Sequence, residues 1–285
     1  MSEVIKIAEA PHLDFKSKDE VYGFLAKNES KIIQAKKGVI HESAHKFKND
    51  SCAYSTKHLM INKLESVKNE IEFKEDFYYP IINTTNVIDS HGDVHLKGIW
   101  NKSAKEKNKK IYYVFDHELK SLSIIVKARD VEIKVIKTTF KQLGYDMDGD
   151  TEALTFVFNK ESVIHDKAED FLNDQEMQNS IRMRYIDVVL CMNSDKPEHK
   201  EYKKNYEKYI GEISNKEDLS EAEYFYAVKQ AEIVSEGSLV PLGSNRFTPI
   251  KYFKSQDIEP LKNTQKEEPN EPIKSLDWNE VISNF

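Results

Sequence analysis

A hydroxyl and two guanidinium groups stand at alternate positions of the short segment NSIRMRY. If this segment is a β-strand, its side chains point to opposite faces with a period of two, so Ser180, Arg182 and Arg184 share one face. The other face would then belong to the core: Ile181, Met183 and Tyr185. A hydroxyl beside two guanidinium groups can anchor a carboxylate or stabilise a developing negative charge. Only four of the 42 basic residues are arginines, and two lie here, where a rigid planar donor is useful.

An imidazole and a carboxylate, each next to an apolar run, are the other candidates for catalysis. His117 follows IYYVF, and Glu236 lies in SEGSLVPLGSN. An imidazole held at the end of a buried strand can act as a general base, or it can be a capped, half-buried side chain. A carboxylate can orient such a histidine through its second ring nitrogen, or it can be an ordinary turn acid. The chain order of Ser, His and Glu decides nothing, because such triads occur in several orders on unrelated folds.

Carboxylates and imidazoles alternate in the segment DSHGDVH, at Asp89, His91, Asp93 and His95. On a strand these four side chains would project from one face, and both residue types are zinc ligands. A flat row of ligands about 7 Å apart cannot close a tetrahedron by itself. A metal site built on His91 and His95 is therefore the weaker interpretation of this segment.

The segment GYDMDGDTE begins like a calcium-binding loop at Asp146, Asp148 and Asp150. Its sixth position is Thr151 instead of glycine, and its twelfth is Val157 instead of a bidentate glutamate. The sequence therefore predicts a solvated turn of a hairpin here.

The candidate residues lie in a region of short β-rich runs that begins at Phe77. The runs are YYPIINTTNVI, KIYYVF, SIIVKARDVEIKVIKTTF, ALTFVF and SIRMRYIDVVLCM, each rich in β-branched and aromatic residues. Two helices are expected after them. One is HKEYKKNYEKYIGEI, with three tyrosines on one face. The other is EAEYFYAVKQAEIV, for which Ser220 and Glu223 would form a capping box. A last strand-like segment, GSLVPLGSN, follows.

These differences in composition along the chain predict three regions. Residues 1–76 would form a mostly helical, polar extension, residues 77–254 the domain with the candidate site, and residues 255–285 a flexible C-terminal tail. The tail holds three of the eight prolines and few apolar residues, so it cannot bury enough surface to fold alone. It ends in LDWNEVISNF, a small apolar segment that could dock on a partner or fold back.

The composition excludes several classes of protein. The chain has 285 residues, of which 39% are hydrophobic and 32% charged, and its net charge is −7, without the basic excess typical of a nucleic-acid reader. No apolar run approaches the roughly 18 residues of a membrane span, and the N-terminus lacks the basic start and apolar stretch of a signal peptide. Two cysteines, Cys52 and Cys191, are too few for a disulfide scaffold, so a reducing, cytosol-like compartment is expected.

Three segments, in this order, resemble motifs of the prohead maturation proteases of tailed phages. The first is NVIDSHGDVHLKGIW followed by YYVFDHELKS. It is similar to a V-D-x-x-G-D-x-x-x-x-G-x-x stretch and an apolar strand that ends in a W-x-H-D-like catalytic histidine. The second, NSIRMRYIDVVLCMNS, resembles the family's segment S-I/V-G-M/F-x-Y/V, and the third, SEGSLVPLGSN, its signature E-x-S-x-V-x-x-x-x-N. The resemblance covers residues 77–249, about 60% of the chain.

The resemblance implies a serine-protease site. Ser180 would be the nucleophile, His117 the general base and Glu236 the orienting acid. Arg182 or Arg184 would hold the oxyanion or an acidic side chain of the substrate. The matches to the opening motif would be structural: Asp89, Gly92, Asp93 and Gly98. The sequence departs from the family's motifs at two places. Arg182 replaces the usual glycine two residues after the nucleophile, and the histidine lies in FDHE instead of W-x-H-D.

The same resemblance implies a fold and a biological role. The fold class would be α+β, with a small, mostly antiparallel β-barrel wrapped by helices, as in the herpesvirus assemblins. The activity would be endoproteolysis, without a cofactor, of scaffold and capsid precursor proteins and of the chain itself, inside the precursor capsid in the host cytoplasm. Capsid and scaffold proteins would be the partners and a homodimer is an implied assembly, whereas neither nucleic acid nor a membrane is an expected partner.

Two other functions stay open at this point. A non-enzymatic capsid-assembly factor could keep the fold without the activity, and Arg182 beside the nucleophile is the best argument for it. A metal-dependent hydrolase built on His91 and His95 is the second alternative. The first question for the structure is therefore whether the imidazole, the hydroxyl and the acid of the predicted triad come within hydrogen-bond distance.

Overall fold

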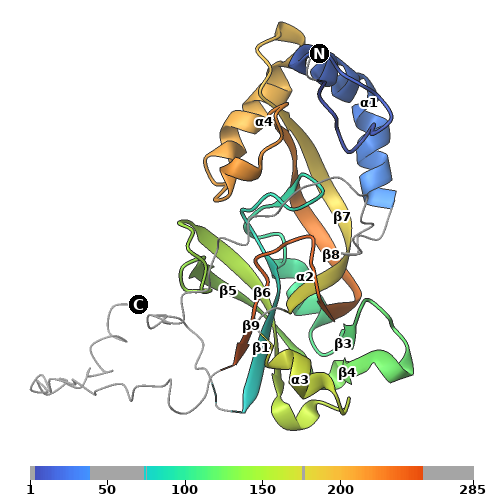
Figure 1. The fold of residues 1–285 in the computed structure, drawn as a ribbon, viewed down its shortest axis with the longest axis vertical. Coiled ribbons are helices and arrows are strands. Elements are labelled where there is room, and N and C mark those ends of the chain that lie inside the picture. The colour runs from blue at the N-terminus through green and yellow to red at the C-terminus, as the bar shows by residue number, and fades with distance from the viewer. Residues whose placement is uncertain (1–3, 39–73, 75, 175–176, 253–285) are drawn as a thin grey trace, which may run out of the picture. The chain divides into compact units, whose positions relative to one another are not determined.

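The computed structural model describes residues 4–38, 74, 76–174 and 177–252. The strands in this part of the chain form two sheets (Figure 1). The first sheet is antiparallel throughout, in the order β5-β6-β1-β9. Its strands are β1 (Phe77–Thr84), β5 (Glu132–Thr139), β6 (Asp150–Asn159) and β9 (Ile250–Tyr252).

Strand β8 is the centre of the second sheet, which is mixed. One edge of β8 pairs antiparallel with β7, and Figure 1 shows the two as long neighbouring strands. The other edge pairs in parallel with β2 and then with β3, and β4 extends the sheet beyond β3. The strands are β2 (Asp93–His95), β3 (Tyr112–Phe115), β4 (Ile124–Val126), β7 (Gln178–Met192) and β8 (Tyr224–Val240).

The helices of the described residues are mostly short, and none is long and apolar enough to cross a membrane. The two longest, α1 and α4, lie beside the same part of the β7–β8 pair (Figure 1). The α-helices are α1 (Lys18–Gly38), α2 (Asn101–Lys107), α3 (Ala168–Leu172) and α4 (Lys200–Ile210). Single 3-10 turns are η1 (Ser121–Ser123), η2 (Ala128–Asp130), η3 (Lys160–Ser162), η4 (Pro197–His199) and η5 (Lys216–Asp218).

The predicted α+β class is confirmed at the level of two sheets and an N-terminal helix, and the described strands do not close into a barrel. Each of the five β-rich runs forms at least one strand. The predicted solvated turn is also confirmed, since it joins β5 to β6 at Thr139 opposite Asp150, with Asp146 and Asp148 exposed. The tyrosine face of α4 is confirmed as well, because Tyr206 and Tyr209 are buried.

The helix predicted over EAEYFYAVKQAEIV is wrong, because most of these residues belong to β8. Glu223 has a left-handed φ of 51°, and its N–H donates to the carbonyl of Ser220 at 2.8 Å. The two residues therefore form a turn instead of a capping box. The segment is rich in aromatic and β-branched residues, which fit a pleated surface, and its backbone is paired with β7 on one edge and β2 on the other. Tertiary pairing thus outweighs the local helical pattern.

The described N-terminal residues pack against the second sheet. Val21 and Leu25 of α1 belong to the same buried core as side chains of β7 and β8. Near the end of α1, Lys36 Nζ lies 2.5 Å from Oδ1 of the fully buried Asp93. Burial would lower the pKa of Lys36, but the charge and hydrogen bond of Asp93 raise it above its ordinary value. This part of the predicted extension therefore shares its core with the predicted domain.

The rest of the predicted extension and the tail predicted over 255–285 fall on residues 39–73 and 253–285, which lie outside the described residues. The division at residue 76 therefore stays a prediction.

The first sheet packs against β8 at Gly237. A Cβ atom at this position would lie 2.7 Å from Phe156 Cε2 and 3.2 Å from Ile82 Cγ2, closer than side chains pack in a normal core. The side chains of β1 and β6 thus approach the backbone of β8 directly. This contact fixes the part of β8 that carries Glu236.

Candidate active site

Three strands of the second sheet bring the candidate side chains together. Strands β3 and β8 pair in parallel up to Phe115, and His117 follows two residues later. Strand β7 pairs antiparallel with β8, and Ser180 lies opposite Ser238. Because Glu236 and Ser238 are two residues apart on one strand, their side chains share a face. The three strands meet in the region labelled β3, β7 and β8 in Figure 1.

The imidazole of His117 lies between the hydroxyl and the carboxylate. Its Nε2 is 2.9 Å from Ser180 Oγ, and its Nδ1 is 2.8 Å from Glu236 Oε1. A carboxylate only accepts hydrogen bonds, so Nδ1 carries the proton of the neutral ring and Nε2 accepts the bond from the Ser180 hydroxyl. Ser180, His117 and Glu236 expose 2%, 7% and 0% of their surfaces. The arrangement can deprotonate a hydroxyl as it attacks an electrophile.

The backbone of His117 is unusual. Asp116 and His117 have left-handed φ values of 50° and 57°, which cost non-glycine residues about 1–3 kcal/mol each. The N–H of His117 donates to Ser238 Oγ at 3.0 Å, and its carbonyl accepts from Arg182 Nη2, also at 3.0 Å. Side chains from β8 and β7 therefore hold this conformation from both ends of the residue.

The carboxylate of Glu236 has three neighbouring donors. Oε1 contacts His117 Nδ1 and lies 3.2 Å from Arg182 Nε, and Oε2 accepts a hydrogen bond from Ser238 Oγ at 2.6 Å. The side chain is fully buried. Burial of a carboxylate is costly unless it is paired and hydrogen-bonded. These contacts satisfy the group and fix the oxygen that faces His117.

The two arginines predicted beside Ser180 lie in different surroundings. The core face of β7 is as expected, with these side chains buried: Ile181, Met183 and Tyr185. Arg182 is partly buried and contacts both Glu236 and His117, whereas Arg184 is exposed and lies opposite Glu232 of β8. The structure therefore brings Arg182 to the acid and the base of the predicted triad and leaves Arg184 at the surface. A role for either arginine at an oxyanion stays a prediction.

The residue before Ser180 is anchored on the side away from β8. The backbone N–H of Asn179 donates to the carbonyl of Thr248 at 3.1 Å, and its side-chain amide donates to the same oxygen at 2.9 Å. Its Oδ1 accepts from Tyr113 OH at 2.5 Å. The start of β7 is thus held by β8 on one edge and by the segment before β9 on the other, which fixes the backbone that presents Ser180.

Ser238 and Asn179 are two residues of the site that the sequence patterns above do not single out. The E-x-S spacing could have identified Ser238, because on a strand it places a hydroxyl on the same face as Glu236. Nothing in the sequence near Asn179 points to its role, since its partners come from β3 and from a segment about 70 residues away.

The segment DSHGDVH does not have the form of a metal site. The condition for four side chains on one strand face is not met, because only Asp93–His95 form a strand and a turn precedes it. The two ring nitrogens of His95 lie 3.1 Å from Asn83 Oδ1 and 3.2 Å from Tyr185 OH. Within the described residues, no group of three or more His, Cys, Asp or Glu is placed to hold a metal ion. The geometry therefore offers no support for a hydrolase built on His91 and His95.

The opening motif forms a tight turn. Oδ1 of Asp89 accepts the backbone N–H groups of His91 and Asp93 at 2.9 and 3.0 Å, and Gly92 supplies a left-handed φ of 71°. Gly98, with a φ of 86°, donates its N–H to Glu152 Oε2 at 2.5 Å. Burial alone would raise the pKa of Asp89, but its interaction with His91 outweighs burial and lowers the pKa to about 2. The contacts of Asp89 thus stabilise the turn itself, and that of Gly98 ties the chain after β2 to β6.

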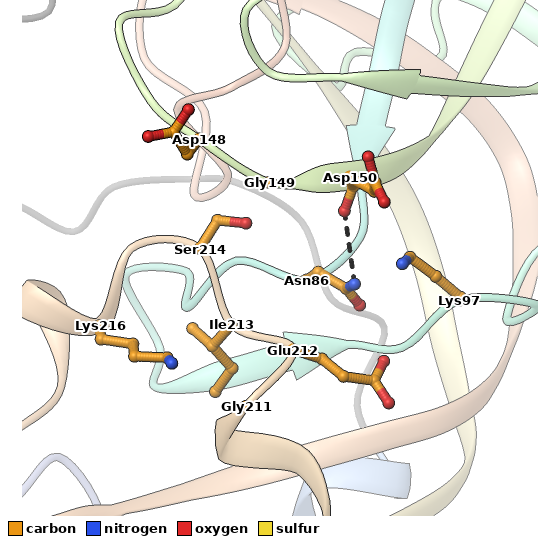
Figure 2. A pocket seen from close by; sticks show the side chains of 10 residues that line it. All are labelled: Asn86, Lys97, Asp148, Gly149, Asp150, Gly211, Glu212, Ile213, Ser214 and Lys216. Carbon is orange, nitrogen blue, oxygen red and sulfur yellow. Dashed lines mark hydrogen bonds between the residues drawn. The ribbon is translucent and has the colours of Figure 1, made fainter.

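A cavity of about 420 Å³ lies elsewhere on the described residues, and no residue of the predicted triad lines it (Figure 2). It is formed by the turn before β6, the segment after α4 and two residues between β1 and α2. Its lining residues are Asn86, Lys97, Asp148, Gly149, Asp150, Gly211, Glu212, Ile213, Ser214 and Lys216. Charges of both signs face it, without an imidazole or a thiol, so it offers no counterpart to the His117 site.

In comparisons with known proteins, no protein-family model matches the chain, and neither a curated protein nor a solved structure does.

Proposed function

We propose that this chain is a serine endopeptidase of viral capsid maturation, with Ser180 as nucleophile, His117 as general base and Glu236 as orienting acid. One observation carries the proposal. Three residues that lie far apart in the sequence form a continuous hydroxyl–imidazole–carboxylate chain, with distances of 2.9 and 2.8 Å. The same three residues match the motifs of the prohead proteases in the family's order.

The proposed reaction is acyl transfer. As Ser180 Oγ forms a bond to the carbonyl carbon of the substrate, its proton moves to His117 Nε2, and Glu236 stabilises the resulting imidazolium. When the carbon–nitrogen bond breaks, the same proton goes to the leaving amine. Water then repeats the sequence on the acyl-enzyme: its proton moves to Nε2, the ester bond breaks, and the proton returns to Ser180 Oγ. No cofactor takes part in these steps.

The burial of Ser180 adds a requirement for access. Since Ser180 exposes only 2% of its surface, a polypeptide reaches its hydroxyl only after neighbouring side chains move.

The proposed substrates are the scaffold and the capsid precursor proteins, together with the chain itself, inside the precursor capsid in the host cytoplasm. The resemblance to the prohead proteases supports this part of the proposal. It also carries the finer description of the fold, a small, mostly antiparallel β-barrel wrapped by helices that would be built from the two sheets, and the proposed homodimer.

A non-enzymatic assembly factor on the same fold is the second candidate. Arg182 in place of the usual glycine and the near-complete burial of Ser180 favour it. This candidate predicts binding to the same capsid and scaffold proteins without their cleavage.

The test is co-expression of the full chain with the capsid and scaffold proteins of its virus, followed by analysis of cleavage products. Wild type should cleave them, and Ser180→Ala should lose about a thousandfold or more of the rate, because removal of a triad nucleophile costs several orders of magnitude. The matched control is Ser194→Ala, since Ser194 is also buried and lies 2.8 Å from an imidazole, that of His199. This control should cleave normally.

The other outcomes separate the alternatives. Cleavage that survives Ser180→Ala would overturn the serine mechanism, and cleavage lost only on addition of a chelator would favour a metal-dependent hydrolase. If both the wild type and Ser180→Ala bind the capsid and scaffold proteins and neither cleaves them, the result would favour the non-enzymatic assembly factor.

A further inference from the structure

Arg182 contacts two members of the predicted triad at once. Its Nε lies 3.2 Å from Glu236 Oε1, and its Nη2 donates to the carbonyl of His117 at 3.0 Å. Glu236 Oε1 is the same oxygen that faces His117 Nδ1. One planar guanidinium therefore spans the acid and the backbone of the base, an arrangement that the single ammonium of a lysine cannot reproduce.

The charges around His117 explain why a cation belongs there. Glu236 on β8 is fully buried, and a buried carboxylate needs a countercharge. Arg182 on β7 supplies it, so the site is neutral while the imidazole is neutral. The loop after β3 contributes two more acids, Asp116 and Glu118, but both are exposed and Glu118 pairs with Lys120 at 3.1 Å. Without Arg182, the nearest group able to balance Glu236 would be His117 in its protonated form.

We propose that Arg182 is a positioning residue that balances the charge of Glu236 and anchors the carbonyl of His117, so that the imidazole stays aimed at Ser180. This inference rests on the proposed function. Arg182 exchanges no proton in the reaction, since the Ser180 proton moves to His117 Nε2 and then to the leaving group. The replacement of the family's usual glycine would thus support the activity, whereas from the sequence alone it favours a protein without activity.

The test measures the rate at which a fluorophosphonate probe labels Ser180 between pH 5 and pH 9, in the full chain. In this reaction Ser180 Oγ forms a bond to phosphorus, fluoride leaves, and the Ser180 proton moves to His117 Nε2. The rate therefore reports on the hydroxyl–imidazole pair without any knowledge of the substrate. The variants are Arg182→Gln, which removes the charge, and Arg182→Lys, which keeps it. Arg129→Met, at an exposed arginine of η2, is the control.

The expected results differ between the variants. For Arg182→Gln, the midpoint of the acidic limb of the pH profile moves upward by about one pH unit, because Glu236 then acts on His117 without a compensating cation. Labelling below the midpoint falls about tenfold as a consequence. Arg182→Lys keeps the wild-type midpoint with a lower maximal rate, since the charge remains and the His117 carbonyl loses its donor. Arg129→Met behaves as wild type.

An unchanged midpoint in Arg182→Gln would overturn the inference, because a merely structural role lowers the rate equally at all pH values. If Arg182→Gln does not fold, Arg182→Lys provides the test. Because this variant keeps the charge, an upward shift of its midpoint by one pH unit would also overturn the inference. A wild type that is not labelled at any pH would overturn the proposed function and this inference with it. If the wild type is labelled and the midpoint of Arg182→Gln equals that of the wild type, this inference alone is overturned.

Discussion

At the scale of single residues, the site depends on a strained histidine held by its neighbours. The left-handed conformation of His117 is stabilised at its N–H by the hydroxyl of Ser238, which also donates to Glu236, and at its carbonyl by Arg182. Residues in such conformations persist only when the surrounding structure determines them strongly. The direction of the imidazole is therefore a property of β8 as much as of the loop that carries His117.

The pair of Asp89 and His91 makes the stability of the opening turn depend on pH. The interaction with Asp89 raises the pKa of His91 above its ordinary value, although burial opposes this. A histidine whose pKa is raised by folding stabilises the folded chain fully below its pKa in the unfolded chain, about 6.5. This stabilisation is lost as the pH rises through its pKa in the folded chain. The lowered pKa of Asp89, about 2, contributes stability above about pH 4 that is lost as the pH falls toward 2.

His91→Gln should therefore reduce the free energy of unfolding more at pH 5.5 than at pH 8.5. The His91 side chain is 46% exposed, so the difference between the two pH values is expected to be about 0.5 kcal/mol or less. Urea unfolding of wild type and variant at both pH values measures it. An equal loss of stability at both pH values would contradict the role given to this pair.

The candidate triad could be identified from the sequence, but the contacts around it could not. Ser180, His117 and Glu236 lie in motifs with a recognisable order, and a motif specifies which residues are present. The position of Arg182 beside Glu236 depends on the register between β7 and β8 and on its rotamer. A one-residue change in register moves every side chain to the other face, so this contact follows only from the folded chain.

At the scale of secondary-structure elements, β8 is the element that organises the site. It carries Glu236 and Ser238. One of its edges pairs with β7, which carries Ser180, and the other pairs with β3, which precedes His117. Local pattern predicted a helix over its first part, because its apolar residues also fit helical spacing. The pairing that decides between the two structures comes from strands more than 30 residues away in the sequence, where a local pattern carries no information.

Gly237→Ala tests how closely the two sheets approach at β8. The new methyl group would lie 2.7 Å from Phe156 Cε2, so Phe156 or β8 must shift, and the expected loss is about 1–3 kcal/mol of unfolding free energy. The proposed activity should fall as well, because Glu236 is the preceding residue. Gly211→Ala is the matched control, since a methyl group there meets nothing within 4 Å. Comparable stability of the two variants in urea unfolding would disprove this close contact.

At the scale of the whole molecule, the described N-terminal residues belong to the same core as the site. Sequence analysis predicted a separate extension because residues 1–76 are polar and their apolar positions are few. Within the described part of this range, Val21 and Leu25 of α1 are buried in the same core as side chains of β7 and β8. A sparse apolar face is enough for a helix that covers an existing sheet, and this sheet is not visible from the helix sequence alone.

Substitutions in the ion pair of Lys36 and Asp93 test how strongly α1 is held to the second sheet. Lys36→Met leaves a fully buried carboxylate without its cation, which should cost about 3 kcal/mol of unfolding free energy. The double variant Lys36→Met with Asp93→Asn should recover part of this loss, because the unpaired charge is then removed. Equilibrium unfolding of the wild type, both single variants and the double variant completes the cycle. Strictly additive losses would show that the two residues do not interact.

The central claim is that Ser180 is activated by His117. Its most direct test is to treat the purified full chain with an excess of a fluorophosphonate and to map the modified peptide by mass spectrometry. One adduct is expected, on Ser180, in the wild type, with none at this position in His117→Ala. Modification of a different serine, or modification of Ser180 that proceeds equally well without the imidazole, would contradict the claim.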